Sequence, residues 1–306
     1  MKIAIIGSGP AGMSSANLLI SNNVDVTVFD ELEEFGGMLA YGLPEYRIPL
    51  SQIRENINKA KDKGIKFVYK KIVNVLELLK ENGGDFDKVI LAIGAGPGLK
   101  LNLPGEDLEG IVDSLEFLKK DKVNQEKMFS AGKTVGVIGG GNSAIDAAMI
   151  AHKQGAKVTV LYRRTEKEMP AFGNELEQAK EAGIKFNFLN GPIEYKKSES
   201  GKIIVKLAIM NLGEEDKSGR ARPIDSGERI EEEFDSILLA VGQRNNLDFL
   251  EKEGIKCEWG KVIVNETSQT SVPNIYAAGD LVTGAKNIAS ATITGSKAAR
   301  HCLIDN

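Results

Sequence analysis

The chain has 306 residues and a formal net charge of −4; 42% of the residues are hydrophobic and 27% are charged. This length is enough for two domains with buried cores, and the slightly acidic balance provides no general attraction for nucleic acid or an anionic membrane. Only two cysteines occur, Cys257 and Cys302, so the sequence contains no disulfide framework, no CxxC pair and no four-cysteine metal set, and we expect no metal site. The apolar run after Met1 is too short for a secretion signal, and no stretch approaches the ~18 apolar residues that cross a bilayer, so we expect a cytoplasmic protein.

The start of the chain has the pattern of a strand, a glycine-rich turn, a helix and a second strand. Residues 2–6 read KIAII, a short β-branched run typical of a strand that is covered on both faces. The turn GSGPAG follows at 7–12, apolar residues at helical spacing continue to Ile20, and VDVTVFD at 24–30 predicts the next strand. This order predicts a βαβ unit.

The same pattern is repeated later in the chain. Residues 134–138 (TVGVI) predict a strand, GGGNSA at 139–144 a glycine turn that opens a helix, and KVTVLY at 157–162 the closing strand. The register is repeated as well, because Tyr162 follows Gly139 at the same interval at which Asp30 follows Gly7. The sequence therefore predicts two βαβ units of one design.

Two further segments resemble each other, and each is an apolar strand that runs into a glycine. VILAIGAG contains Gly94, and ILLAVGQR contains Gly242. Strands of this kind end at the carboxyl edge of a parallel sheet, where ligands bind. Between these features, residues 113–129 have the apolar spacing of a surface helix, and residues 196–233 have the charge runs of polar hairpin tips. The chain as a whole predicts an α/β fold with two Rossmann-like dinucleotide-binding domains.

The two glycine turns suit the pyrophosphate of a dinucleotide. The first glycine permits a tight turn, the second clears a path for phosphate oxygens, and the third lets the helix approach the strand. The N-terminus of the following helix offers unpaired N–H groups and a partial positive charge. The residues expected at the first pyrophosphate are Gly7, Gly9, Pro10, Ala11 and Gly12, and those at the second are Gly139, Gly140, Gly141, Asn142, Ser143, Ala144 and Asp146.

The residues that follow the second strand of each unit predict which nucleotide it prefers. An acid at this position accepts hydrogen bonds from the adenosine ribose, so Asp30 predicts an unphosphorylated ribose, as in FAD or NAD. The second unit has Tyr162 at this register, followed by Arg163 and Arg164. A carboxylate would repel a 2′-phosphate, whereas arginine binds one through paired, charge-assisted hydrogen bonds. We therefore expect NADPH at the second site; the alternative is that the two arginines are ordinary surface charges.

Three longer motifs carry a resemblance to one known family: the stretch from VTVFD to GGMLAYGLPEYRIP (26–49), GGGNSAIDAA (139–148) and YRRTEKEMPA (162–171). The two repeated units, together with NIYAAGDLVTG (274–284), resemble a wider class of proteins. Over almost the whole chain, the sequence resembles the glutamate synthase small (beta) subunit family. Its core is similar to that of the large subunit of NADH-dependent ferredoxin:NADP oxidoreductase. The wider class is the two-domain flavoproteins typified by thioredoxin and glutathione reductases.

This resemblance implies FAD in the first unit, NADPH in the second and hydride transfer between them, with the flavin rather than a catalytic side chain carrying the chemistry. The implied FAD-binding domain comprises 1–110 and 244–306, and the inserted NADPH-binding domain comprises 111–243. Further residues expected at FAD are Gly37, Met38, Arg47, Gly94, Gly279, Asp280, Ala289 and Thr292, and further residues expected at NADPH are Glu168 and Gly242. The alternatives are a turn role for Asp280 and simple close packing for the small residues of the helix expected at 287–301.

The resemblance also bears on the electron acceptor. The chain begins at the first strand, so we expect it to lack the N-terminal iron–sulfur domain of that family. Electrons would then pass to a partner protein, such as a glutamate synthase large subunit-like protein or a separate ferredoxin or iron–sulfur subunit, and an oligomer is compatible with this. A stand-alone reductase of a small acceptor or quinone is the alternative, followed by a non-catalytic nucleotide-sensing module. Reduction of thioredoxin-like disulfides is disfavoured because no cysteine pair occurs near the expected flavin in the sequence.

Overall fold

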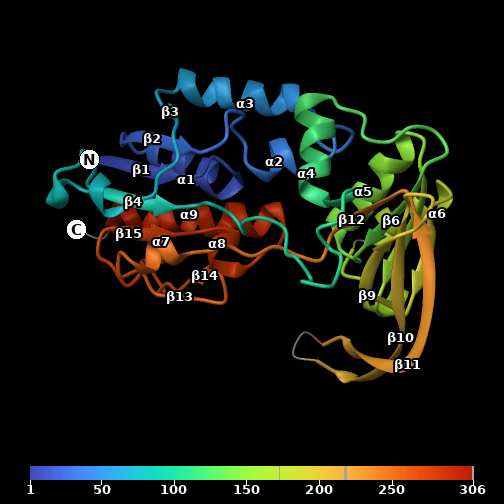
Figure 1. Cartoon of the computed structure of the whole chain (residues 1–306). Coiled ribbons are helices and arrows are strands. Elements are labelled where there is room, and N and C mark those ends of the chain that lie inside the picture. Colours follow the sequence, from blue (N-terminus) through green and yellow to red (C-terminus); the bar gives the residue numbers. More distant parts are fainter. Residues whose placement is uncertain (172, 217–218, 305–306) are drawn as a thin grey trace. The chain divides into compact units, whose positions relative to one another are not determined.

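The computed structural model describes residues 1–171, 173–216 and 219–304, and it contains two compact units (Figure 1). Unit 1 comprises Met1–Pro97 and Gln243–Asn306, and unit 2 comprises Gly98–Gly242. Residues 98–110 therefore group with unit 2, whereas the sequence analysis placed them in the first domain. In the described parts of the chain, no helix has both the length and the apolar character needed to cross a lipid bilayer.

Unit 1 is built on a five-stranded sheet with the strand order β15-β4-β1-β2-β3, in which all neighbours are parallel. Its strands are β1 (Lys2–Ile6), β2 (Asp25–Asp30), β3 (Lys66–Tyr69), β4 (Lys88–Leu91) and β15 (Ile275–Ala277), with a small hairpin of β13 (Cys257–Glu258) and β14 (Lys261–Val262). Its helices are α1 (Pro10–Ile20), α2 (Met38–Tyr41), α3 (Leu50–Asp62), α7 (Asp248–Glu251), α8 (Asp280–Thr283) and α9 (Ile288–Ile304), and its 3₁₀ turns are η1 (Leu76–Leu78) and η2 (Lys80–Asn82).

Strand β1 is buried on both faces, as its unbroken apolar run predicts. Ile3 and Ile5 belong to the hydrophobic cluster that includes residues of α1 and α9, whereas Ala4 and Ile6 belong to a second cluster. Because successive side chains of a strand point to opposite faces, these two clusters cover the two sides of the sheet. The sheet of unit 1 therefore lies inside the unit, with its glycine turn at the carboxyl edge of β1.

Unit 2 contains a second parallel sheet and an antiparallel one. The parallel sheet has the strand order β5-β12-β6-β7-β8, and the antiparallel sheet has the order β11-β10-β9. The strands are β5 (Ile111–Asp113), β6 (Thr134–Ile138), β7 (Lys157–Tyr162), β8 (Lys185–Phe188), β9 (Asn190–Lys197), β10 (Ile203–Glu215), β11 (Ala221–Phe234) and β12 (Ser236–Leu239). The helices are α4 (Ser114–Lys119), α5 (Asn142–Lys153) and α6 (Gly173–Glu181), with the π-type turn η3 (Lys120–Asn124) and the 3₁₀ turn η4 (Glu166–Glu168).

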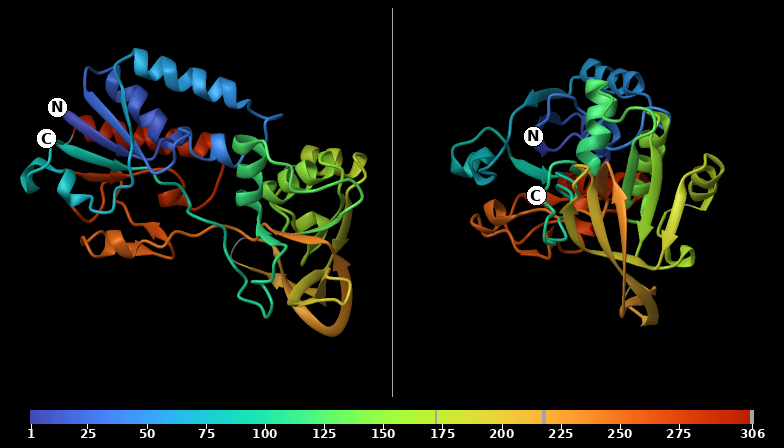
Figure 2. Two further views of the ribbon diagram at one scale, coloured as in Figure 1. Left: turned by 45° about the horizontal axis from the view of Figure 1, so that its top comes forward. Right: turned by 45° about the vertical axis from the view of Figure 1, so that its right-hand side comes forward.

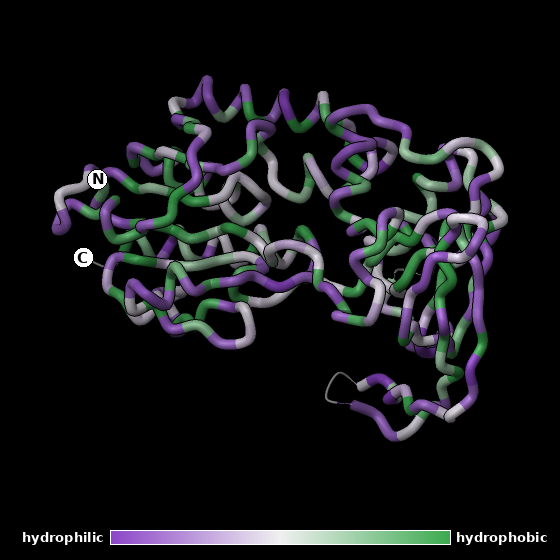
Figure 3. The backbone as a smooth tube through the Cα atoms, in the orientation of Figure 1, coloured by the Kyte–Doolittle hydropathy of each residue, from purple (hydrophilic) through white to green (hydrophobic). Residues whose placement is uncertain are grey.

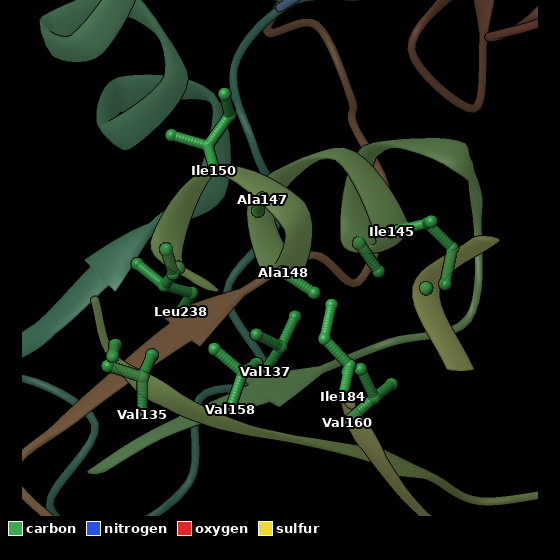
Figure 4. Packing of buried hydrophobic residues seen from close by; sticks show 14 of the residues in the cluster. Val135, Val137, Ile145, Ala147, Ala148, Ile150, Val158, Val160, Ile184 and Leu238 are labelled. Atoms are coloured by element: carbon green, nitrogen blue, oxygen red, sulfur yellow. The ribbon is translucent and has the colours of Figure 1, made fainter. Parts of the chain in front are cut away.

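The core of unit 2 lies between α5 and its parallel sheet. Figure 4 shows Val135, Val137, Val158 and Val160 of β6 and β7 beneath α5, with Leu238 of β12 beside them. These residues are at most 3% exposed. Helix α5 is rich in alanine, so its backbone can approach the strands closely, which positions its N-terminus above the carboxyl edge of β6.

The two units share one strand register. Ile3 of β1 pairs with Val26 of β2, and Val135 of β6 pairs with Val158 of β7. The two pairs have the same separation along the sequence, so the duplication expected from the sequence is also present in the pairing of the strands. The fold class expected from the sequence is confirmed: each unit has a parallel sheet with a glycine turn between its first strand and first helix.

Two segments of unit 2 differ in detail from the expectation. The helix expected over 113–129 is the short α4 followed by η3. The segment expected as polar hairpin tips contains two long strands, β10 with 13 residues and β11 with 14, which project from the body of the unit (Figures 1 and 2). Figure 3 shows hydrophobic residues gathered along the central strands and many hydrophilic residues along this hairpin.

Candidate dinucleotide-binding sites

In the turn after β1, the packing of the protein itself requires the first and third glycines. Gly7 has φ +104°, and its N–H donates to the Phe29 carbonyl oxygen at 2.7 Å. A Cβ on Gly7 would lie 2.3 Å from the Ala92 oxygen, and a Cβ on Gly12 would lie 1.9 Å from the Gly7 oxygen. These distances leave no space for a side chain at either position, so the two glycines allow α1 to pack directly against the strand.

The middle glycine of the same turn is not required by protein packing. The nearest protein atom to a Cβ added at Gly9 is the Cα of Gly37, at 3.9 Å. Gly9 is also the N-cap of α1, where no side chain accepts from the exposed N–H groups, and Pro10 follows as the first helical residue. A Cβ there would make only an ordinary contact, so the chain itself does not exclude a side chain at this position. The uncapped N–H groups of the helix fit a pyrophosphate.

The turn after β6 repeats this arrangement. Gly139 has φ +141°, and a Cβ on it would lie 2.2 Å from the Ala240 oxygen. At Gly141, the N-cap of α5, the nearest atom to an added Cβ is a Pro170 carbon at 4.0 Å. Ala144 takes the third position and is fully buried. The residues of the second turn therefore also fit a pyrophosphate, with Asn142 and Ser143 in the first turn of α5 and Asp146 buried behind them.

The structure joins Asp30 to the first glycine turn through a residue that the sequence analysis did not select. Asp30 is 8% exposed, and its Oδ2 accepts from the N–H of Ser8 at 2.8 Å and from the Ser8 hydroxyl at 2.5 Å. Its Oδ1 accepts from the Leu32 N–H at 3.0 Å, and the Ser8 oxygen accepts from the Gly36 N–H at 2.9 Å. The acid is therefore fixed at the edge of the turn, in the place expected for a ribose-binding carboxylate.

Other residues expected at FAD lie around the same turn. Gly37 has φ +55°, and a Cβ on it would lie 2.7 Å from the Cα of Gly9. Gly279 has φ +72°, its N–H donates to the Thr294 hydroxyl at 2.9 Å, and a Cβ on it would lie 2.8 Å from the Cβ of Ala11. Both glycines thus bring separate loops into contact with the glycine turn.

The remaining residues expected at FAD lie in several elements of unit 1. Gly94 has φ +76°, and no atom lies within 4 Å of an added Cβ, so this strand end also leaves open room. Burial raises the pKa of Asp280, although the Lys286 N–H donates to its Oδ1 at 3.3 Å. Arg47 lies 6.0 Å from the Tyr46 ring centroid. The others, which are exposed at the starts of α2 and α9, are Met38, Ala289 and Thr292.

The two adjacent arginines of unit 2, Arg163 and Arg164, have different surroundings. Arg163 is exposed, and no described residue forms a hydrogen bond or ion pair with its guanidinium. Arg164 is 5% exposed; its Nη2 lies 2.6 Å from Asp216 Oδ2, and its Nε donates to the Ala221 carbonyl at 2.7 Å. Arg164 therefore ties the end of β7 to the β10–β11 hairpin, and Arg163 alone faces solvent.

Two more residues expected at NADPH have structural partners. Glu168 is 9% exposed, and its Oε2 accepts from both the N–H and the hydroxyl of Thr165, which forms a capping box for η4. The hydrogen bond from the Thr165 hydroxyl lowers the pKa of Glu168. Gly242 has φ +111°, and its carbonyl accepts from the Leu99 N–H at 2.8 Å. Both residues remain predicted contacts of NADPH, although the Glu168 carboxylate already accepts hydrogen bonds from Thr165.

Two parallel sheets, each with a glycine turn opening onto its first helix, define a protein of the two-dinucleotide-domain class. Residues 1–297 match the model of the pyridine nucleotide-disulphide oxidoreductase family, and the chain belongs to this family of NAD(P)H-dependent flavin oxidoreductases. Its similarity to the glutamate synthase small chain, expected from the sequence motifs, is confirmed by the relatives described next.

The chain is 36% identical over 305 residues to the NADP(+)-dependent formate dehydrogenase subunit beta of Moorella thermoacetica, a match that covers 97% of the chain and 43% of that protein. It is 34% identical over 316 residues to the glutamate synthase [NADPH] small chain of Escherichia coli, covering 97% of the chain and 67% of that protein. The chain therefore spans less than half the length of the first of these relatives and about two thirds of the second.

Two solved structures show the same fold. FprA of Mycobacterium tuberculosis, in complex with NADPH, matches with a TM-score of 0.83 and 21% identity, covering 99% of the chain and 84% of FprA. The thioredoxin reductase of Lactococcus lactis matches with a TM-score of 0.77 and 23% identity, covering 99% of the chain and 98% of that protein.

Proposed function

We propose that this chain binds FAD in unit 1 and NADPH in unit 2, and that it transfers reducing equivalents from NADPH through FAD to a partner protein. The observation that carries the proposal is the paired geometry of the glycine turns. In each, the middle glycine is the N-cap of a helix without a side-chain cap and has room for a Cβ, and only in the first does the closing strand end in an acid that accepts hydrogen bonds from the turn. When bound, FAD would accept a hydride from NADPH and give electrons to the acceptor.

The residues of unit 1 would hold the adenine end of FAD. The N–H groups at the start of α1 would bind the pyrophosphate, with the partial positive charge of the helix supporting it. Asp30 Oδ1 accepts one hydrogen bond from the protein and Oδ2 accepts two, and a carboxylate has about four acceptor positions, so one position is open to a ribose hydroxyl. Met38, Arg47 and the exposed start of α9 would line the approach to the flavin ring.

In unit 2 the start of α5 would bind the second pyrophosphate, and the exposed guanidinium of Arg163 would bind the 2′-phosphate. A preference for NADPH is supported by two findings: no carboxylate occupies the register of Asp30, and Arg163 is available to an anionic ligand. We keep Arg164 as the anchor of the hairpin rather than as a second phosphate ligand, because its guanidinium already has Asp216 and the Ala221 carbonyl as partners.

The acceptor is proposed to be a separate protein. Two relatives are named as a subunit beta and a small chain, which supports a subunit role. Neither cysteine is in a disulfide; Cys302 is buried, and burial raises the pKa of Cys257 to about 11, so neither suits a thiolate relay to a disulfide substrate. The proposed partner therefore accepts electrons from the flavin without a cysteine pair of this chain.

The direct test is anaerobic titration of the FAD-loaded chain with NADPH, followed by copurification of partners from native extract with absorbance and iron analysis. Loss of the flavin absorbance within seconds, and a bound iron–sulfur protein that becomes reduced, would support the proposal. Rapid flavin reduction with turnover of small acceptors or quinones and no protein partner would favour a stand-alone reductase. Binding without reduction would favour a nucleotide-sensing module.

A further inference from the structure

The second residue of each glycine turn differs between the units together with the residue that ends the second strand. Unit 1 has Ser8 with Asp30, and unit 2 has Gly140 with Tyr162. We propose that these residues act as a matched pair that decides which ribose each site accepts, and that Tyr162 with Gly140 is the form that accepts a 2′-phosphate. This inference rests on the NADPH function proposed above and identifies Tyr162 as a specificity-determining residue.

In unit 1 the pair forms a closed hydrogen-bonded set. Ser8 is completely buried, and both its N–H and its hydroxyl donate to Asp30 Oδ2. The Ser8 oxygen also accepts from the N–H of Gly36, so the serine links the turn, the acid and the next loop. The result is a fixed negative charge at the edge of the turn, which suits a neutral ribose hydroxyl and repels a phosphate.

In unit 2 the ring of Tyr162 occupies the space into which a side chain on Gly140 would project. A Cβ added at Gly140 would lie 2.5 to 2.9 Å from three carbons of the Tyr162 ring, so no larger residue fits there while the ring is present. Tyr162 is 6% exposed, and its hydroxyl donates to the Glu168 carbonyl at 2.8 Å. The Ala171 N–H in turn donates to the Gly140 carbonyl at 3.3 Å. The ring thus holds the 165–171 loop against the glycine turn.

The difference between Ser8 and Gly140 also changes whether the backbone N–H at this position is available to a ligand. In unit 1 the N–H of Ser8 is occupied by the carboxylate of Asp30. At the same position of unit 2, Gly140 is buried, and no described residue accepts a hydrogen bond from its N–H. A buried amide without an acceptor is costly, so an anionic oxygen is the partner that this position favours. The guanidinium of Arg163, directly after Tyr162, adds a positive charge to the same strand end.

The test exchanges the pairs in the full chain saturated with FAD. The variants are Gly140→Ser, Tyr162→Asp, the double variant and Tyr162→Phe, and NADPH and NADH are titrated separately by calorimetry while melting temperatures are recorded. We expect the double variant to lower the ratio of NADPH affinity to NADH affinity at least about tenfold, because its new carboxylate would accept from the N–H of residue 140 and repel the 2′-phosphate. Gly140→Ser alone should melt at a lower temperature than the double variant, since only there does the serine meet the ring.

Tyr162→Phe is the matched control, because it keeps the ring and introduces no charge. Loss of the hydroxyl leaves the Glu168 carbonyl without that donor and should lower the melting temperature, but it places no carboxylate near the 2′-phosphate, so the ratio of the two affinities should stay within about threefold of the unmodified value. If the double variant does not fold, Tyr162→Asp alone carries the test, since it adds no atom at Gly140 and should shift the ratio in the same direction. An unchanged ratio in a folded aspartate variant, or an equal shift in Tyr162→Phe, would overturn the matched pair. An unmodified FAD-loaded chain that binds neither nucleotide would instead overturn the proposed function itself.

Discussion

Replacing Arg163 and Arg164 one at a time separates nucleotide binding from folding. Arg164 makes two charge-assisted contacts, to Asp216 at 2.6 Å and to the Ala221 carbonyl at 2.7 Å, and a contact of this kind contributes about 1.5–3 kcal/mol. The side chain of Asp216 is 30% exposed, so water replaces part of that contact in a variant. We therefore expect Arg164→Ala to lower the free energy of unfolding by about 2–3 kcal/mol.

Arg163→Ala is the matched comparison, since it removes the same functional group from the neighbouring residue. Its exposed side chain makes no hydrogen bond or ion pair with the described residues, so the free energy of unfolding should change by less than about 0.5 kcal/mol. Loss of its contact with the 2′-phosphate should weaken NADPH binding about tenfold or more and leave NADH binding nearly unchanged.

Urea unfolding monitored by circular dichroism gives the first quantity, and calorimetric titration with NADPH and NADH gives the second. The reasoning fails if Arg164→Ala keeps its unfolding free energy and loses NADPH affinity selectively, because Arg164 would then bind the phosphate. It also fails if Arg163→Ala weakens the binding of NADPH and NADH equally, since the guanidinium would then not contact the 2′-phosphate.

The other predictions concern the flavin site, acid stability and a thiol. Gly9→Ala should fold normally but lose most of its bound flavin, measured by absorbance after reconstitution. Gly12→Ala should also lower the melting temperature, because its Cβ would lie 1.9 Å from the Gly7 oxygen. Equal flavin content in Gly9→Ala and the unmodified chain would contradict this prediction. The N–H of Thr134 and the ammonium of Lys133 lower the pKa of Asp235 from its ordinary 3.8 to about 2. The ionised carboxylate therefore stabilises the folded chain fully above pH 3.8, and this contribution is lost as the pH falls toward 2. Asp235→Asn should remove that part of the acid unfolding curve, and superimposable curves would refute the assignment. Burial raises the pKa of Cys257 to about 11, so alkylation followed by mass spectrometry should be slow at neutral pH and rise steeply toward pH 11, and rapid alkylation at neutral pH would contradict the burial.

The duplicated architecture could be predicted because it depends on short-range pattern. Unbroken apolar runs, two glycine turns and one repeated interval from turn to closing strand define both parallel sheets, and the pairing of Ile3 with Val26 and of Val135 with Val158 agrees with that interval. The positive φ of Gly7 and Gly139 is encoded equally locally, since only glycine takes such a conformation without strain.

Contacts between distant parts of the chain could not be predicted in this way. Arg164 and Asp216 lie 52 residues apart, and no periodicity marks the aspartate as a partner, so the sequence suggested two equivalent arginines. The β10–β11 hairpin was also difficult, because most of β11 is exposed on both faces and shows no alternation of apolar and polar residues. Ser8 and Tyr162 did carry a signal: each differs from its counterpart in the other unit, and the two differences occur together.

The measurement that tests the account most directly is the nucleotide stoichiometry and preference of the full chain. Reconstitution with FAD and removal of the excess, followed by calorimetric titration with NADPH and then NADH, should give one FAD and one NADPH per chain, with NADPH bound at least about tenfold more tightly, or about 1.4 kcal/mol. A folded chain that retains no flavin, or that binds both reduced nucleotides equally, would contradict the assignment of two adenine nucleotide sites of which only the second accepts an additional phosphate.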